Sequence, residues 1–396
     1  MQINDLVDIK SKNVKSILDC IRRNSSMTKK DIATMTGLSF ATVSNLCNEL
    51  KSMGITEECK VTTSRIGRTP SGLCIRRNRY CFVVLDFRLE NMLGFAIIGI
   101  QNNVLYQATM DTSMLHSPEA VIRYAKEKFD EVVEILNLKD TIFLRVGAAV
   151  PAIYDSVDGR LKTCTIPMFA DYPLKSALAE VFGIQAYVDN ITNFGALSIY
   201  SQVRSNSPIV CLDISQGVGV GLIVNGMLIR GKNGYGSEIA HVPIGRPEAV
   251  CTACGRTGCA EILLSVGGMT AQFQDIPNSI PLLLRWQRFV DIMQAGGEKP
   301  AAIAHEIGEQ VGKLASILIN LFDPSYFGIS GYIVDIYNLI QPYVEKEINA
   351  RCSLSMDRGL KLQLLSNAFS SIYRGVGDAL YEAWNPFEDH IAASDE

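Results

Sequence analysis

The sequence predicts a two-part fold, in which a small helical N-terminal module with a β-wing precedes a larger α/β body. Charge divides the chain in the same place. Residues 1–80 hold 14 Lys/Arg against 7 Asp/Glu, a net charge of +7, whereas the remainder carries 23 basic and 34 acidic residues, a net of −11. Apolar residues follow a helical period in the first part, and strands alternate with amphipathic helices in the second. A basic module on an acidic body indicates an anionic partner.

The N-terminal module, residues 1–78, is predicted to be a winged helix-turn-helix. Its first helix is indicated by apolar residues at i, i+3, i+4 and i+7, namely Val14, Ile17, Leu18 and Ile21. Thr28, with Asp31 three residues later, fits the N-cap of a second helix. Gly37 supplies the turn before a third helix, which Gly54 ends. The residues that follow alternate enough for a β-hairpin with a basic tip.

The outer face of the third helix carries short hydrogen-bonding side chains, which suit base edges and phosphates in the major groove. The basic hairpin tip would lie against the phosphate backbone or in the minor groove. The predicted DNA contacts are Thr28, Ser39, Phe40, Ala41, Thr42, Ser44, Asn45, Asn48, Arg65 and Arg68. The alternative is a plain three-helix module for protein contacts. The glycine turn, polar face and basic wing together favour DNA.

The body, residues 79–396, alternates strands and helices. Strand pairs are predicted in 81–100 and 208–231, a strand in 143–154 and a strand end in 185–190. Helical periodicity indicates a helix at 121–138 and the end of a helix at 176–183. Residues 313–331 are predicted to be a helix followed by a strand. This alternation indicates α/β architecture.

Several linked motifs of the body occur in one order: VGAAVPAIYD, DNITNFGAL, ISQGVGVGLIVNG, GSEIAHVPIG, CTACGRTGCAE and NLFDPSYFGISG. In these motifs the chain resembles the ROK family of repressors, open reading frames and sugar kinases, over nearly its whole length and in the repressor layout. The resemblance implies an actin-like ATPase fold of two α/β lobes around a cleft. We expect one lobe at about 79–190 plus the C-terminal helix, and the other at about 191–375.

One departure from the family pattern removes the general base that phosphoryl transfer needs. Family kinases carry an Asn-Asp pair whose Asp is that base, and here the pair is Asn190-Ile191. An isoleucine cannot accept a proton. Asp189, on the other side of Asn190, would point away from the position that Ile191 occupies.

The phosphate loop departs independently. The family pattern Asp-x-Gly-Gly-Thr here reads Asp86-Phe87-Arg88-Leu89-Glu90, which lacks both glycines and places a repelling carboxylate at Glu90. Gly217, Gly219 and Gly221 remain from the later pattern, but they suit a tight strand turn as well as a nucleotide. With two separate losses, we expect no enzymatic activity and no catalytic residue.

A metal site is predicted from His241, Cys251, Cys254 and Cys259, because one imidazole and three thiols within 19 residues fit a tetrahedral Zn²⁺. The alternative is free cysteines beside an unrelated histidine. The site resembles the family's zinc site, with Cys-x-x-Cys in place of the usual Cys-x-Cys. Four protein ligands leave no open position for water, so the expected role is structural.

The resemblance also implies a sugar site. Of the family's sugar-contacting residues this chain keeps Asn190, Glu238, His241 and Glu261, and it replaces others by Ile191 and Ala240. Carboxylates and an amide around a cleft suit a polyol. The alternative is that both glutamates are ordinary polar residues and His241 serves only zinc. Because Ile191 leaves one hydroxyl unpaired, the ligand would differ from glucose-like sugars, or be absent.

Together these features predict a DNA-binding transcriptional regulator, and more specifically a repressor of carbohydrate-metabolism genes whose kinase-like domain is inactive. We expect a homodimer or dimer of dimers on a double-stranded operator, a small-molecule effector and structural Zn²⁺. The polar N-terminus and the absence of a long apolar stretch favour the cytoplasm. The alternatives are an active sugar kinase with a fused DNA-binding domain, and a regulator controlled by a protein partner.

Overall fold

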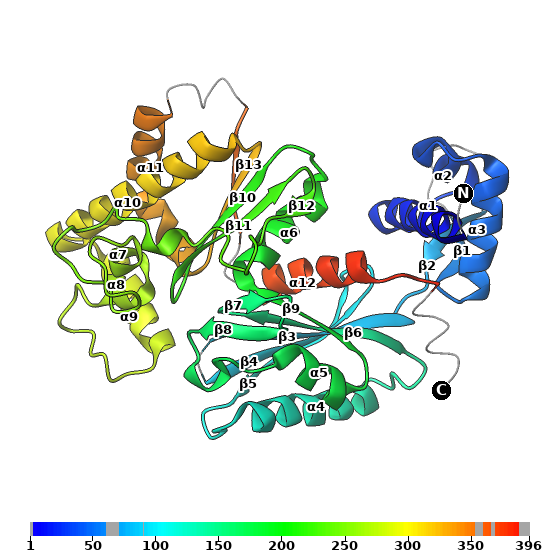
Figure 1. The fold of residues 1–396 in the computed structure, drawn as a ribbon, viewed down its shortest axis with the longest axis horizontal. Helices are drawn as coiled ribbons and strands as arrows, with labels where there is room; N and C mark the ends of the chain where they lie inside the picture. Colours follow the sequence, from blue (N-terminus) through cyan, green and yellow to red (C-terminus); the bar gives the residue numbers. More distant parts are fainter. Residues whose placement is uncertain (1–2, 61–70, 90, 353–358, 366–368, 388–396) are drawn as a thin grey trace.

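The computed structural model describes residues 3–60, 71–89, 91–352, 359–365 and 369–387 (Figure 1). An N-terminal head of three helices and a two-stranded hairpin stands beside a body with two five-stranded sheets. No helix in these ranges has both the length and the apolar character needed to cross a membrane.

The head has the predicted winged helix-turn-helix architecture. Its elements are α1 (Ile3–Asn24), α2 (Lys29–Thr36), α3 (Phe40–Ser52), β1 (Thr56–Lys60) and β2 (Ser71–Ile75). The Thr28 hydroxyl caps α2 by accepting from the N–H of Asp31 at 3.2 Å, and Ser39 caps α3 in the same way. Gly37 makes the turn between them in the left-handed region, with φ 70°. These local predictions are confirmed because caps and turns depend on near neighbours.

The first helix is longer than its apolar stripe, since α1 begins at Ile3. Its added turns rest on the far end of the chain. The ammonium of Lys10 lies 4.3 Å from the centre of the Phe387 ring, and the Ser11 hydroxyl donates to Asn385 at 3.4 Å. Polar residues therefore extend this helix because a distant segment packs against them.

The two sheets of the body share one topology. The first has the order β5-β4-β3-β6-β9 and the second has the order β12-β11-β10-β13-β14. In each order the first two strand pairs are antiparallel and the last two are parallel. The first-sheet strands are β3 (Tyr80–Leu89), β4 (Met92–Gly99), β5 (Val104–Asp111), β6 (Ile142–Val150) and β9 (Gln185–Asn190). Those of the second are β10 (Ile209–Ile214), β11 (Val218–Val224), β12 (Met227–Leu228), β13 (Tyr326–Ser330) and β14 (Lys361–Leu364). A separate hairpin pairs β7 (Ala152–Asp155) with β8 (Arg160–Cys164).

Helices cover the sheets and join them. The longer ones are α4 (Pro118–Ile135), α5 (Leu174–Phe182), α6 (Ile191–Val203), α9 (Leu282–Ala295), α10 (Glu298–Phe322), α11 (Tyr337–Arg351) and α12 (Phe369–Ala383), with the short α7 (Glu261–Leu264) and α8 (Val266–Thr270). In Figure 1, α12 (red) lies between the first sheet and α6, and the chain leaves it toward the head.

Close backbone approach fixes the crossing of α6 and α12. A Cβ built at Gly375 would lie 2.1 Å from the carbonyl oxygen of Phe194, so only glycine fits there. The same core continues into the head, because buried residues of α1 and α3 cluster with residues of α12 and β3. The head is thus packed on the body and is not carried on a free linker.

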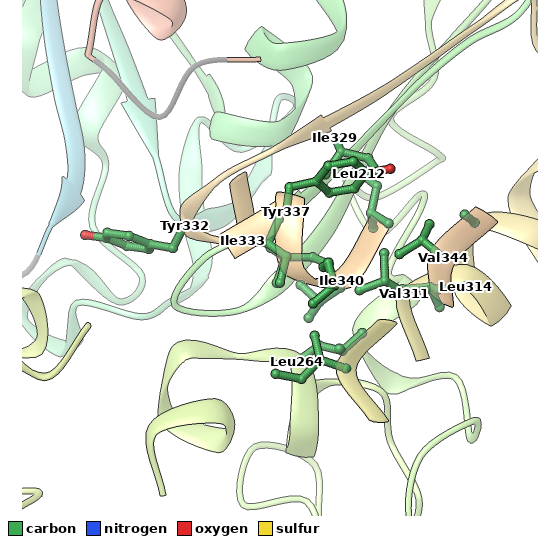
Figure 2. Close-up of a cluster of buried hydrophobic side chains, with 14 of the residues drawn as sticks. Leu212, Leu264, Val311, Leu314, Ile329, Tyr332, Ile333, Tyr337, Ile340 and Val344 are labelled. Carbon is green, nitrogen blue, oxygen red and sulfur yellow. The ribbon is translucent and has the colours of Figure 1, made fainter. Parts of the chain in front are cut away.

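The second lobe has its own apolar core, drawn in Figure 2. Leu212, Ile329, Val311 and Val344 bring β10, β13, α10 and α11 together there. Tyr332 stands apart, with its hydroxyl pointing away from the cluster. It is 5% exposed and lines the cavity described next.

Candidate functional site

A cavity of about 790 Å³ lies between the two sheets of the body. Its walls come from β7, the start of α6, the turn between β10 and β11, and the segment 230–243 that follows β12. The four residues predicted to contact a sugar, Asn190, Glu238, His241 and Glu261, all line it. The structure therefore brings together side chains that lie up to 71 positions apart in the sequence.

Glu238, His241 and Glu261 form one wall of the cavity. The Glu261 carboxylate lies 3.9 Å from Nδ1 of His241. Burial raises the pKa of both glutamates, and for Glu238 the charge of Glu261 adds to this effect, while His241 opposes it. Half-buried carboxylates of this kind can accept hydrogen bonds from the hydroxyls of a polyol.

Asn190 has a second duty that the sequence did not indicate. Its Oδ1 caps α6 by accepting from the N–H and the hydroxyl of Thr192, each at 2.9 Å. Its Nδ2 donates to the carbonyl of Ala152 at 2.8 Å. Most of the hydrogen-bonding capacity of this amide is used to shape the cleft, which leaves less of it for a ligand.

The position of the missing base is occupied by an aliphatic side chain. Ile191 is 9% exposed and lines the cavity, whereas Asp189 is absent from the cavity wall among the described residues. The buried Asp189 carboxylate accepts from Nε and Nη2 of Arg230 at 2.9 and 2.6 Å. Asn193 donates to it at 2.6 Å. A carboxylate held by these donors cannot serve as a base in the cleft.

A salt bridge occupies the former phosphate loop. Asp86 is fully buried, and its Oδ2 accepts from Nε of Arg88 and pairs with Nη2, both at 2.7 Å. Burial opposes the charge on Arg88, yet the carboxylate of Asp86 holds the guanidinium pKa above its ordinary value. Arg88 lines the cavity together with Asp213 of the other sheet. Glu90 lies outside the described residues.

Two of the three glycines of the later pattern serve packing. A Cβ at Gly219 would lie 2.6 Å from Cγ2 of Thr192, and one at Gly221 would lie 2.1 Å from the carbonyl oxygen of Thr192. Both glycines let β11 approach α6 closely. Their presence therefore has a structural reason that is independent of any nucleotide.

The four predicted metal ligands lie in one group, with their ligand atoms all within 4.8 Å of one another. The Sγ atoms of Cys254 and Cys259 are 3.5 Å apart, and Sγ of Cys251 is 3.8 Å from Nδ1 of His241. Tetrahedral Zn²⁺ with Zn–S bonds of about 2.3 Å would hold its thiolates about 3.8 Å apart, so the residues present fit this ion. A backbone N–H at Arg256 lowers the pKa of the Cys254 thiol, which favours the ligating thiolate.

The head presents the predicted face of α3 to solvent. Phe40, Ala41, Asn45 and Asn48 are exposed, and Phe40 is 59% accessible. The ammonium of Lys29 on α2 donates to Oδ1 of Asn48 at 2.8 Å. Thr28 and Ser39 act as helix caps, with Ser44 and Thr42 half-buried beside them. Arg65 and Arg68 of the wing lie outside the described residues.

Ion pairs and ring contacts fasten the head to α12. Nη2 of Arg22 lies 2.6 Å from Oδ1 of Asp378, and both side chains are almost fully buried. Lys15 donates to the carbonyls of Tyr381 and Trp384, and its ammonium is 3.8 Å from the centre of the Tyr381 ring. Since α12 crosses α6, and α6 begins at the cavity, packed helices connect the cleft to the head.

Sequence reasoning missed two groups that shape the site. The pairing of Arg230 with Asp189 joins residues 41 positions apart, and no local pattern predicted it. Tyr332 was also missed. For Arg230 the one available signal was its place directly after a short apolar segment, in MLIRG.

Comparison with known proteins adds two kinds of finding. The profile of the ROK family matches residues 92–358, and that of a winged helix-turn-helix DNA-binding domain matches residues 10–55. The chain is 23% identical over 375 residues to the xylose repressor of Caldicellulosiruptor bescii, covering 92% of this chain and 91% of that protein. It is 21% identical over 369 residues to the DNA-binding transcriptional dual regulator NagC of Escherichia coli, covering 88% and 87%.

Solved structures agree with this fold. The crystal structure of a ROK family transcriptional regulator, described as a homologue of the E. coli MLC protein, matches with TM-score 0.78 at 19% identity, covering 97% of this chain and 99% of that one. A ROK family glucokinase from Streptomyces griseus, in complex with glucose and AMPPNP, matches with TM-score 0.57 at 17% identity, covering 75% of this chain and 98% of that one. The kinase match leaves about a quarter of this chain uncovered.

Proposed function

The chain belongs to the ROK family, and from that premise we propose that it is a sugar-responsive transcriptional repressor of carbohydrate-metabolism genes. One observation carries the proposal. The winged helix-turn-helix head is packed against α12, which also contacts the cleft helix α6. The cleft keeps polar groups, but Ile191 and a salt bridge stand where catalysis would need a base and a phosphate loop.

The DNA-binding part of the proposal rests on α3. A homodimer would place two such helices in successive major grooves of a near-palindromic operator, about 34 Å apart. The exposed Phe40, Ala41, Asn45 and Asn48 would meet base edges, and the capped helix starts would face phosphates. Repression is the proposed sign because the relatives include the xylose repressor of Caldicellulosiruptor bescii.

The regulatory part rests on the route from cleft to head. A sugar held by Glu238, Glu261 and His241 would change the relation of the two lobes, and α12 would carry that change to α1. For DNA affinity to change, the ligand must bind the two arrangements unequally. The expected coupling is on the order of 1–3 kcal/mol, about 5- to 150-fold in affinity.

Genome-wide mapping of bound sites tests this function most directly, because the neighbouring genes would indicate the metabolite. Operator fragments found in this way would then be used in binding titrations with a panel of sugars. A Glu238→Ala variant should bind the operator normally and lose the response to the sugar. If its response to the effector is unchanged, the assigned sugar site is wrong.

Zinc is proposed to hold the loop that carries His241 against the cleft, with no chemical role. Removal of the ion by a chelator should lower the unfolding temperature and weaken operator binding, because four side chains lose their common anchor. The measurements are thermal unfolding and operator affinity before and after chelation, with restoration by added Zn²⁺ as the control. If zinc is released while both quantities stay unchanged, the structural role is refuted.

Two other functions are distinguishable by simple assays. A sugar kinase would give sugar-dependent ADP release in a coupled assay, which Ile191 and Arg88 predict will not occur. A regulator controlled by a protein partner would retain that partner in a pull-down whether or not sugar is present.

A further inference from the structure

A lysine of α2 reaches across to the exposed face of α3. The two helices pack against each other in the head (Figure 1). Nζ of Lys29 donates to Oδ1 of Asn48 at 2.8 Å and to the hydroxyl of Ser44 at 3.3 Å. Ser44 and Asn48 are four positions apart and therefore share one side of the helix. Lys29 thus adds a positive charge to a helix whose own residues 40–48 include no lysine or arginine.

The charge of Lys29 is not matched by a carboxylate. Glu49 of α3 pairs with Lys10 at 2.8 Å, and Glu58 of β1 pairs with Lys51 at 2.5 Å. Within the part of the chain that the structure describes, no carboxylate lies within salt-bridge distance of the Lys29 ammonium. An ammonium has three hydrogens to donate, and Lys29 uses two of them within the head. Its third hydrogen and its charge remain available to a ligand.

The same contact determines which way round the amide of Asn48 lies. An ammonium only donates hydrogen bonds, so the amide atom that faces Lys29 must be the oxygen and not the nitrogen. The side chain of Asn48 is exposed, and its Nδ2 has two hydrogens to donate. A base edge at this position would therefore meet an amide donor and an ammonium donor next to each other.

We propose that Lys29 and Asn48 together read a guanine in the major groove of each operator half-site, an assignment that rests on the DNA-binding function proposed above. Guanine presents two acceptors there, N7 and O6, which suit one amide N–H and one ammonium N–H. An asparagine alone typically reads adenine, by donating to N7 and accepting from the N6 amino group. Here that amino group would meet a positively charged donor, because Oδ1 of Asn48 is held by Lys29. Lys29 is therefore a specificity-determining residue that lies outside the recognition helix.

The test is the selection of bound duplexes from a library of random-sequence DNA by the full-length, zinc-loaded chain and its variants. For the wild-type chain we expect one position of each half-site to prefer guanine about 5- to 150-fold, the discrimination given by a base contact with two hydrogen bonds. Lys29→Met should lose this preference and favour adenine at the same position, because Oδ1 becomes free to accept. Asn48→Ala should lose the preference there without a new one. The matched control is Lys30→Met, at the exposed neighbouring lysine of α2, which should keep the guanine.

The outcomes separate the guanine contact from the proposed function. If Lys29→Met weakens binding evenly across sequences, lowers the salt slope by about one and keeps the guanine, then Lys29 contacts a phosphate and the base assignment is wrong. If the wild-type chain selects a sequence in which no half-site position prefers guanine, the assignment fails even where a variant does not fold, and the DNA-binding function stands. If no sequence is selected, the assignment and the proposed function fail together.

Discussion

Single side chains decide what the cleft and the head can recognise. Ile191 stands where a kinase has its proton acceptor, and Arg88 forms a salt bridge where a kinase has its phosphate loop. Oδ1 of Asn190 caps α6. Residues 40–48 of α3 contain no lysine or arginine, so this part of the helix itself lacks the usual guanine-reading side chains. Recognition there must come from amides, hydroxyls and apolar contacts.

Phe40 is expected to contact a thymine methyl group in the operator, because it is 59% exposed at the start of α3. Replacing the contacted thymine by uracil should weaken binding by the wild-type protein about fourfold, the effect of about 0.8 kcal/mol for one buried methyl. The measurement is a gel-shift titration with operators substituted one thymine at a time. For a Phe40→Ala variant, replacing the same thymine by uracil should not weaken operator binding further. A uracil scan that is flat for the wild-type protein contradicts this contact.

Lys15 should give the head–body contact a pH dependence. Burial lowers its pKa from 10.5 to about 8, with smaller opposing effects from nearby Glu382 and Asp19. Between about pH 8 and 10.5 the unfolded chain therefore binds more protons at this residue than the folded chain, so the free energy of unfolding rises with pH. The slope is at most ~1.4 kcal/mol per pH unit, and below this window the contribution is constant.

Urea unfolding at several pH values across this window measures the slope, and a Lys15→Met variant is the control, because it should lack this increment while all other titrations remain. If the curves of the two proteins run parallel, Lys15 is not the group responsible.

At the scale of helices and strands, the crossing of α6 and α12 is the element that joins the functional parts. It depends on Gly375, which admits close contact with the backbone of Phe194. Because α6 starts at the cavity wall and α12 contacts α1, a change in the packing of α6 on α12 would affect both the cavity and the head.

Gly375→Ala should lower the free energy of unfolding by about 1–3 kcal/mol, since the new Cβ meets a backbone oxygen that cannot move aside. Denaturant unfolding measures this. The control is Gly267→Ala in α8, where the nearest atom to the new Cβ is a side-chain oxygen at 3.8 Å. Equal effects at the two positions would show that the crossing has room to relax.

Elements were predictable from sequence to the extent that near neighbours determine them. Thr28, Ser39 and Gly37 determine the ends of the head helices, and continuous apolar runs marked the central strands. The metal group was also visible, since three of its four residues lie within nine positions. The first turns of α1 and the partner of Asp189 were not predictable, because each depends on a segment that folding brings from far along the chain.

At the scale of the whole molecule, the head and the body form one connected structure. Buried residues of α1, α3, β3 and α12 belong to a single core, and the Arg22–Asp378 pair lies at its edge. A change between the lobes can therefore reach the head through packed side chains, without a flexible joint.

Asp378→Asn should leave sugar affinity unchanged while it reduces the effect of sugar on operator affinity. Asp378 accepts from Arg22 at 2.6 Å and from Asn102 at 2.7 Å, and loss of its charge should reduce the free energy of unfolding by about 1.5–3 kcal/mol. Sugar affinity, measured by calorimetry, should stay unchanged, while the effect of sugar on operator affinity shrinks. Asp130→Asn, in an exposed pair with Lys126, is the matched control and should change neither quantity. A full sugar response in Asp378→Asn would place the coupling elsewhere.

The shared core has a consequence for how binding-site geometry is inherited. If the body sets the position and angle of the head, the distance between operator half-sites is a property of residues after 80. A chimera that carries another regulator's recognition helix on this α1 should read new bases at the old spacing. A chimera that exchanges the whole head, without matching the surface that meets Tyr381 and Trp384, should lose the spacing as well. Sequence preference and spacing would then evolve on separate parts of the chain.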